Sequence, residues 1–256
     1  MTRRTIICHY HIFKTAGTSF EKILRNNFGE RHLSFDGPTT SSVISQPELV
    51  SVIDANPDLV SLSSHQITLP APTSDLFTLV PVIFVRHPIL RIRSVFLHEN
   101  RHRHNMSEGA SLAGFDSWFE GLLSGDPNQL QICNLQTNLL SRAYDKPPVG
   151  QEIDGRPVYD LDAALDNLSK VACLGRTEYF DRDVASFIPI LFERGFDLEY
   201  ATPIRENVGA PDFGLSHLEQ LQRMQADLST ETWDLLHWFN HQDLALFKAV
   251  CGRIDS

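Results

Sequence analysis

The chain has 256 residues, of which 42% are hydrophobic and 21% are charged, an ordinary globular composition that excludes general disorder. This length allows one large domain, and we expect residues 1–256 to form it. No apolar run approaches the roughly 18 residues that a membrane-spanning helix needs, and the run after Arg4 is too short for a signal-peptide core. The four cysteines form no C-x-x-C pair, so they indicate reduced thiols and a cytoplasmic location, with neither a disulfide framework nor a zinc site.

The net charge of -10 argues against a nucleic-acid partner, because binding to a phosphate backbone needs an excess of Lys and Arg. The charge is uneven, however. Residues 1–34 and residues 86–104 each carry a surplus of four positive charges. These two basic islands in an acidic chain predict a local anion site. The alternative is a chance clustering of basic residues on solvated helices.

Short β-branched runs alternate with amphipathic stretches along the chain, as in a parallel sheet covered by helices. The predicted strands are residues 5–9, 59–62, 80–85 and 171–174. Four predicted helices are residues 18–28, 160–170, 181–194 and 230–251. A capping box at Ser45 predicts another helix, which runs to Ala55, and a further helix begins near Pro88. Residues 115–144 are predicted to form two helices with a break at 125–127. Residues 146–157 and 200–214 have the composition of irregular surface segments.

The most informative segment, residues 11–19, reads HIFKTAGTS and lies between the first predicted strand and the first predicted helix. A tight turn of small residues before a helix N-terminus presents backbone N–H groups to an anion, and the helix dipole adds positive potential. Lys14 adds a full charge, and the hydroxyls of Thr18 and Ser19 can donate to phosphate oxygens. This is not a Walker A loop, because the lysine precedes the glycine. The alternative is a well-capped helix beside a solvated lysine.

A second segment, residues 82–94, reads VIFVRHPILRIRS and begins inside a predicted buried strand. Arg86 stands at the carboxyl end of that strand, where ligands bind in open α/β sheets. Ser94 follows eight residues later, about two turns into the next helix. Because a guanidinium suits phosphate geometry, Arg86 and Ser94 would converge on one phosphate if this helix folds back beside the strand. The alternative for Arg86 is an ion pair with a carboxylate.

Together the two segments resemble the sulfotransferases that use 3′-phosphoadenosine 5′-phosphosulfate (PAPS), in particular the carbohydrate type that includes the heparan sulfate 2-O- and 6-O-sulfotransferases. The family's first loop reads approximately H-x-P-K-T-G-G-T-S and its second R-x-P-x-x-R-x-x-S. The matching positions here are His11, Lys14, Thr15, Gly17, Thr18, Ser19, Arg86, Pro88, Arg91 and Ser94. Phe13 and Ala16 depart from the first pattern. Residues 175–178 and 206–208 are looser matches to the family's G-x-T-E and N-V segments.

The resemblance implies an α/β fold, a single P-loop-nucleotide-kinase-like domain with a mostly parallel central sheet flanked by helices. It implies an enzyme that moves the sulfuryl group of PAPS to a hydroxyl or amine of an acceptor, without a metal. Lys14 would stabilise charge on the sulfuryl group and on the leaving phosphate. The residues that would hold the nucleotide are Lys14, Thr15, Gly17, Thr18 and Ser19 at the 5′-phosphate and Arg86 and Ser94 at the 3′-phosphate.

In the resembling family a histidine between the two phosphate loops is the general base, and this position corresponds to His65. Without the resemblance, one histidine of 11 would not be singled out. His98 and Glu99 are the next candidates for the base. His98, His102 and His104 lack a carboxylate or cysteine at ligand spacing, so we interpret them as a solvated basic helix end rather than a metal site.

Two other functions remain open at this point: an ATP-dependent kinase on a related fold, and a nucleotide- or anion-binding module without catalysis. The missing Walker A lysine position argues against the kinase. The net charge of -10 favours a neutral or weakly charged acceptor, a carbohydrate or small metabolite, over a highly sulfated polysaccharide. The sequence indicates neither the acceptor nor the oligomeric state.

Overall fold

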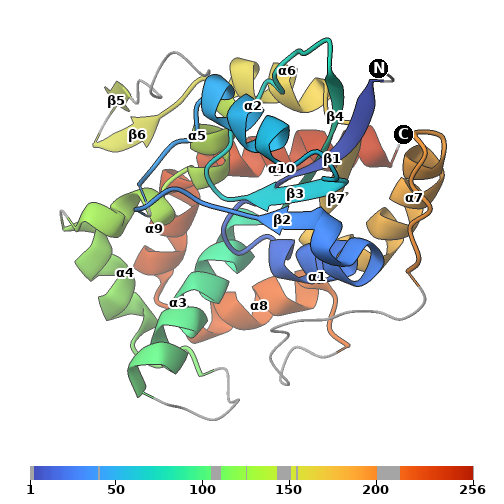
Figure 1. The fold of residues 1–256 in the computed structure, drawn as a ribbon. Helices are drawn as coiled ribbons and strands as arrows, with labels where there is room; N and C mark the ends of the chain where they lie inside the picture. Colours follow the sequence, from blue (N-terminus) through green and yellow to red (C-terminus); the bar gives the residue numbers. More distant parts are fainter. Residues whose placement is uncertain are drawn as a thin grey trace.

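A five-stranded sheet forms the centre of the protein (Figure 1). The computed structural model describes residues 3–39, 41–104, 111–124, 126–142, 151–153, 155–200 and 214–255, with the backbone alone at 101–104, 127 and 151. The strands are β1 (Arg4–Tyr10), β2 (His32–Ser34), β3 (Ser61–Ser64), β4 (Phe77–Val85) and β7 (Cys173–Arg176), in the order β2-β3-β1-β4-β7. Every neighbouring pair is parallel, which confirms the predicted fold class.

The helices connect these strands, and several begin or end where the sequence predicts. They are α1 (Gly17–Phe28), α2 (Gln46–Ala55), α3 (Pro88–His104), α4 (Phe115–Leu123), α5 (Leu135–Ser141), α6 (Leu161–Ser169), α7 (Phe180–Phe192), α8 (His217–Asp227), α9 (Thr230–Phe239) and α10 (His241–Ile254). Gly29, at φ 54°, ends α1, and Ser45 with Glu48 forms the predicted capping box of α2. Among the described helices, none is both long and apolar enough to cross a membrane.

The sheet is covered on both faces because side chains alternate along each strand. On β1, Ile6 and Cys8 belong to a core cluster with α2, α6 and α10, whereas Ile7 packs with α1 and α7. Figure 1 shows α1 and α7 on one side of the sheet and α2 and α6 on the other. A third cluster joins α3, α4, α8 and α9 through residues such as Phe96 and Phe119. β4 is almost entirely buried, as its apolar sequence predicts.

Two predictions about elements are corrected. The last predicted helix, 230–251, is two helices, because at Asn240 the backbone leaves the helical conformation and the side-chain amide donates to the carbonyls of Ile132 and Leu236. The predicted surface connection contains a hairpin of β5 (Gln151–Ile153) and β6 (Arg156–Val158) with Gly155 at φ 78°. Strand β2 and helix α8 were not predicted. Residues 206–208, matched loosely to the N-V segment, lie outside the described residues.

The strand order places the carboxyl end of β1 at the centre of the sheet edge. After β1 the chain runs to the outer strand β2, returns to β3 beside β1, and then crosses to β4 on the other side of β1. In open α/β sheets ligands bind outside the carboxyl ends of strands at such a reversal. The residues that follow β1, β3, β4 and β7 therefore define the candidate site.

Candidate active site

The turn between β1 and α1 has an uncommon backbone at two residues. Lys14 and Ala16 have φ angles of 65° and 63°, in the left-handed region that non-glycine residues rarely occupy. The N-cap residue of α1, Ala16, makes no side-chain hydrogen bond to the helix, and the first turn carries no acidic residue. The first N–H groups and the dipole of α1 therefore favour an anion at this position.

Gly17 makes room for the His11 ring at the start of α1. A Cβ atom at position 17 would lie 1.9 Å from Cδ2 and 2.2 Å from Nε2 of His11. Both distances are far shorter than any tolerated contact, so a larger residue would displace the imidazole. The glycine of the first loop is thus a packing requirement as well as a turn residue.

The three hydroxyl residues of the first loop have different surroundings. Thr15 is buried, and its hydroxyl donates to the carbonyl of Ile12 at 2.9 Å, so this side chain closes the turn. Ser19 is also buried, and its N–H donates to the carbonyl of Ala16 at 3.0 Å. Thr18 is exposed. Of the three, Thr18 therefore has the hydroxyl most accessible to a ligand.

Lys14 lies beside an aromatic side chain that links the first loop to α3. Its Nζ is 5.6 Å from the centroid of the Phe13 ring, within cation–π range. The Phe13 ring in turn contacts His98 of α3, with 5.9 Å between ring centroids. Phe13 therefore couples the position of Lys14 to the helix that carries the second motif.

Arg86 is held by contacts from three other segments. Its N–H donates to Oε1 of Gln136 and its carbonyl accepts from Nε2 of the same amide, both at 2.8 Å. Its guanidinium Nη1 donates to the carbonyl of Lys14 at 3.2 Å, and its Nε lies 3.9 Å from Oε1 of Glu178. Lys14 and Arg86, 72 residues apart in sequence, are thus brought into contact.

Glu178 is a buried carboxylate beside this arginine, in the segment that loosely matches G-x-T-E. Its Oε1 accepts the N–H of His87 at 3.0 Å, whereas Oε2 is buried without a hydrogen-bond partner in the described structure. Burial raises the pKa of Glu178, and the nearby charge of Arg86 opposes this change. Arg86 therefore has both contacts: the carboxylate partner that was the predicted alternative, Glu178, and a hydrogen bond to Lys14 in the first loop.

The second motif contributes one accessible residue and one buried residue on α3. Ser94 is half-buried. No contact joins Ser94 to Arg86 among the described atoms, so their convergence on a phosphate stays a prediction. Arg91 is fully buried, donates from Nη2 to the carbonyl of Gln131, and has its pKa lowered to about 10 by burial. Arg91 is thus packed in the interior, where its Nε and Nη1 have no hydrogen-bond partner in the described structure.

His65 directly follows β3, at the place the sequence predicts. Its side chain is 41% exposed, and its ring stacks on that of His11 with 3.9 Å between centroids. Its Nδ1 lies 3.0 Å from Oδ2 of Asp36, and its N–H donates to Oδ1 of the same carboxylate at 2.8 Å. His65 is thus an accessible imidazole with one ring nitrogen held by a carboxylate.

The other candidate bases have less suitable surroundings. His11 is buried, and burial together with the adjacent His65 lowers its pKa to about 4, although Glu21 acts in the opposite direction. Glu99 accepts the indole N–H of Trp118 at 3.0 Å and so faces α4. His98 packs against Phe13. Of these groups, His65 combines exposure with an orienting partner.

For His98, His102 and His104, near the end of α3, the sequence predicts a solvated basic helix end rather than a metal site. The side chains of His102 and His104 lie outside the described residues. Among the residues whose side chains are described, no group of three or more His, Cys, Asp or Glu is arranged to hold a metal ion.

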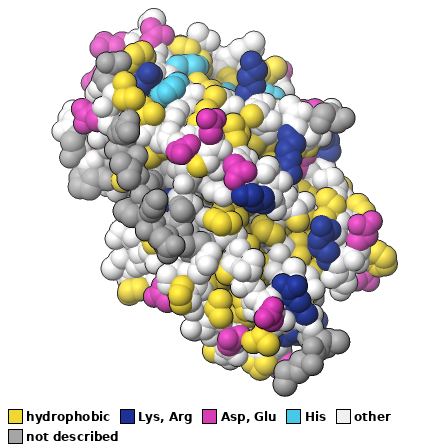
Figure 2. Space-filling view, turned by 90° about the horizontal axis from the view of Figure 1, so that it is seen from above, with side chains coloured by type: hydrophobic (Ala, Val, Ile, Leu, Met, Phe, Trp, Pro, Cys, Tyr) yellow, Lys and Arg dark blue, Asp and Glu magenta, His cyan; other side chains and the backbone are white. Residues whose placement is uncertain are grey.

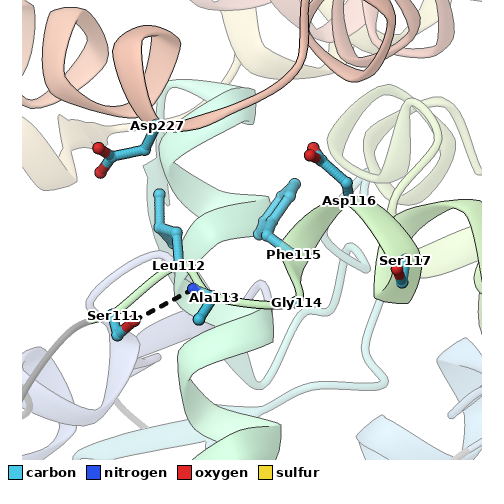
Figure 3. Close-up of a pocket in the computed structure, with 8 residues that line it drawn as sticks. All are labelled: Ser111, Leu112, Ala113, Gly114, Phe115, Asp116, Ser117 and Asp227. Atoms are coloured by element: carbon cyan, nitrogen blue, oxygen red, sulfur yellow. Dashed lines mark hydrogen bonds between the residues drawn. The ribbon is translucent and has the colours of Figure 1, made fainter.

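A surface hollow of about 430 Å³ lies away from the strand ends, at the start of α4 (Figure 3). Residues 111–117 and Asp227 line it, and the labelled carboxylates of Asp116 and Asp227 flank its opening. No Lys or Arg is among these lining residues. Two carboxylates without a cation disfavour an anionic ligand, so this hollow is not a candidate nucleotide site.

The surface shown in Figure 2 carries charges of both signs. On the part of this face that is described, Lys and Arg side chains are scattered among Asp and Glu side chains, with apolar side chains between them. They form no continuous basic strip on the described part of this face. A long polyanion is bound by such a strip, so this face has no feature suited to one.

A sequence model of the sulfotransferase family matches residues 1–248. The chain belongs to the sulfotransferase family. An uncharacterized protein of Archaeoglobus fulgidus is similar to it, with 27% identity over 254 residues that cover 96% of each chain. Membership supports an enzyme that transfers sulfate, and the parallel α/β sheet agrees with the family's fold. The carbohydrate type stays a prediction.

In this sulfotransferase the residues predicted from the two motifs follow β1 and β4, and His65 follows β3, at the same edge of the sheet. The structure adds Gln136 and Asp36, which the sequence analysis missed. Gln136 of α5 makes two hydrogen bonds to the backbone of Arg86, and no local sequence pattern predicts this contact. Asp36 follows a strand of three residues, too short to be predicted by its periodicity.

Proposed function

We propose that this sulfotransferase moves the sulfuryl group of PAPS to a hydroxyl or amine of an acceptor, a carbohydrate or small metabolite. The observation that carries the proposal is the hydrogen bond from Arg86 Nη1 to the carbonyl of Lys14, which joins the two predicted phosphate loops. PAPS carries phosphate groups on both the 5′ and the 3′ oxygen of one nucleoside, so its binding requires two anion sites close together. We also propose that residues 1–256 act as one domain.

The first loop would hold the 5′ end of the nucleotide and the second loop its 3′-phosphate. The N-terminus of α1, where the N-cap residue makes no side-chain hydrogen bond, and the positive charge of Lys14 suit an anion. The residues assigned to the 5′ side are Lys14, Thr15, Gly17, Thr18 and Ser19, and those assigned to the 3′-phosphate are Arg86 and Ser94. Because the Thr15 hydroxyl is bonded within the turn, Thr15 would contribute through its backbone N–H.

In the transfer, an acceptor oxygen or nitrogen forms a bond to sulfur as the bond between sulfur and the 5′-phosphate oxygen breaks. The acceptor loses a proton, which His65 would take on Nε2, the nitrogen that Asp36 does not hold. Histidine side chains have an unperturbed pKa of about 6.5, which suits proton uptake near neutral pH. Lys14 would balance the charge that develops on the departing phosphate oxygen of 3′-phosphoadenosine 5′-phosphate (PAP).

The test is turnover of PAPS, measured as PAP released, over a panel of glycans, lipids, peptides and phenols. We expect Lys14→Ala to lose most of the rate while its melting temperature stays close to that of the parent, because a loop lysine contributes little to the core. Lys248→Ala, at an exposed position of α10, is the matched control and should keep the parent rate. Near-parent turnover by Lys14→Ala would remove Lys14 from its assigned role. Binding of PAP without turnover of any acceptor would instead indicate a nucleotide-binding module.

His65→Ala should separate catalysis from nucleotide binding. We expect kcat to fall by roughly 10²–10⁴, the usual range for a general base, while PAP affinity stays within about threefold of the parent. If His65→Ala lost PAP binding as severely as turnover, His65 would be a nucleotide-binding or structural residue and not the general base.

A further inference from the structure

Strands β2 and β3 are parallel neighbours, and their register brings a carboxylate to His65. Ser34 of β2 pairs with Ser63 of β3, so Asp36 and His65 are each two residues beyond this pair in their own segments. The ladder continues past β2, because the N–H of Phe35 donates to the carbonyl of Ser63 at 3.1 Å. Asp36 is therefore placed by the sheet itself, although it follows the last residue of its strand.

Asp36 is fixed by contacts that leave one of its oxygens to the imidazole. Its Oδ1 accepts from the hydroxyl of Ser64 at 2.9 Å and from the N–H of His65 at 2.8 Å. Its Oδ2 lies 3.0 Å from Nδ1 of His65. An ionised carboxylate only accepts hydrogen bonds, so the proton of a neutral His65 must be on Nδ1 and the lone pair on Nε2.

We propose that Asp36 is the positioning residue for the general base of this enzyme. The inference rests on the proposed function, because it assigns the partner of the histidine that takes the acceptor's proton. Asp36 holds the imidazole through Nδ1–H, keeps Nε2 available to the acceptor, and balances the positive charge on the ring once the proton has moved. One face of the imidazole is covered by the His11 ring, so the carboxylate at the ring edge and the stack together restrict its rotation.

The charged and titratable groups around the pair do not replace this carboxylate. Glu21 is directed to His11, with 3.7 Å between its Oε2 and Nδ1 of that ring, and to Arg25 at 2.6 Å. His11 meets His65 face to face, an arrangement that offers no hydrogen bond to its Nδ1. Removing Asp36 therefore leaves Nδ1 of His65 without its acceptor.

The first measurement compares kcat and PAP affinity of Asp36→Ala, Asp36→Asn and the control Asp54→Ala, which changes an exposed carboxylate of α2. We expect both Asp36 variants to lose roughly tenfold or more in kcat, but no more than His65→Ala loses. PAP affinity should be unchanged, because the hydrogen bonds of Asp36 go to Ser64 and His65, which are not assigned to the nucleotide. Asp36→Asn keeps the shape of the side chain, so it provides the comparison if Asp36→Ala fails to fold.

The second measurement reads the tautomer of His65 directly by ¹⁵N NMR of protein labelled at histidine, with His65→Gln used to assign the signals. In the parent we expect the neutral ring to carry its proton on Nδ1, and in Asp36→Ala on Nε2. A parent with the proton on Nε2, or Asp36 variants with parent kcat, would overturn the assignment of Asp36 while the transferase function stands. A parent that turns over no PAPS would overturn the proposed function, and the role of Asp36 with it.

Discussion

Ala16 holds a backbone conformation that its side chain disfavours. It precedes α1 with φ 63° and ψ 12°, in the left-handed helical region. A residue with a Cβ atom pays roughly 1–2 kcal/mol there, a penalty that glycine does not have. The first-loop pattern of the family has glycine at this position, so the strain belongs to this chain and not to the loop in general.

Replacing Ala16 by glycine should therefore stabilise the fold. We expect the free energy of unfolding to rise by up to about 1 kcal/mol, because the greater freedom of glycine in the unfolded chain offsets part of the relieved strain. Urea unfolding followed by tryptophan fluorescence measures it. The matched control is Ala185→Gly at an exposed position inside α7, which should lower stability by about 0.5–1 kcal/mol. Equal losses in the two variants would show that Ala16 is not strained.

At the scale of elements, the position of Arg86 depends on two helices far from it in sequence. Gln136 of α5 binds the N–H and the carbonyl of Arg86. Asp243 of α10 is fully buried and accepts the N–H groups of Gln136 and Thr137 at 3.0 and 2.7 Å. The Asp243 carboxylate of α10 thus caps the start of α5. This cap fixes Gln136, whose side-chain amide bonds the backbone of Arg86.

Because Arg86 is assigned to the 3′-phosphate, nucleotide selectivity should depend on it. We expect PAP to bind at least tenfold tighter than 5′-AMP, since a hydrogen bond to a charged group contributes about 1.5–3 kcal/mol. Arg86→Ala should remove most of this difference and change AMP affinity little, whereas Arg194→Ala, an exposed arginine after α7, should keep it. Calorimetric titration with both nucleotides measures the ratio. Equal affinity of the parent for PAP and AMP would contradict the assignment.

The sequence predicts the elements whose signals are local and misses those that depend on distant contacts. A strand, a loop and a helix start lie together around Lys14 and again around Arg86, so both loops could be located. Asn240 interrupts the last predicted helix because its amide bonds to Ile132, more than 100 residues away, and no periodicity reports that contact. Asp36 reaches His65 only because β2 and β3 pair in one register. Local sequence patterns contain neither the pairing nor the register.

At the scale of the whole molecule, the chain keeps several histidines out of water. Burial is the main cause that lowers the pKa of His11, His32 and His87 to about 4, and it also lowers the pKa of His9 well below its ordinary value. In the unfolded chain these groups would return to the ordinary histidine value near 6.5. The folded state therefore holds fewer protons than the unfolded state between these two values.

This difference predicts a loss of stability in mild acid. Above about pH 6.5 the histidines are neutral in both states, so they do not lower the free energy of unfolding. As pH falls toward 4, only the unfolded state takes up protons, and the free energy of unfolding falls. Each such histidine contributes a loss of up to about 1.4 kcal/mol per pH unit. Glu178, whose pKa is raised, acts in the opposite direction but is a single group.

Urea unfolding at pH 7.5, 6.5 and 5.5 tests this prediction, and one variant isolates the share of a single ring. His87 packs on Phe247 with 5.4 Å between ring centroids, and its Nδ1 is buried without a hydrogen-bond partner in the described structure. His87→Leu keeps an apolar contact and removes one titrating group, so its stability should fall less steeply with acid than that of the parent. A parent whose urea midpoint is constant from pH 7.5 to 5.5 would show that these histidines are protonated, or exposed to water, in the folded state.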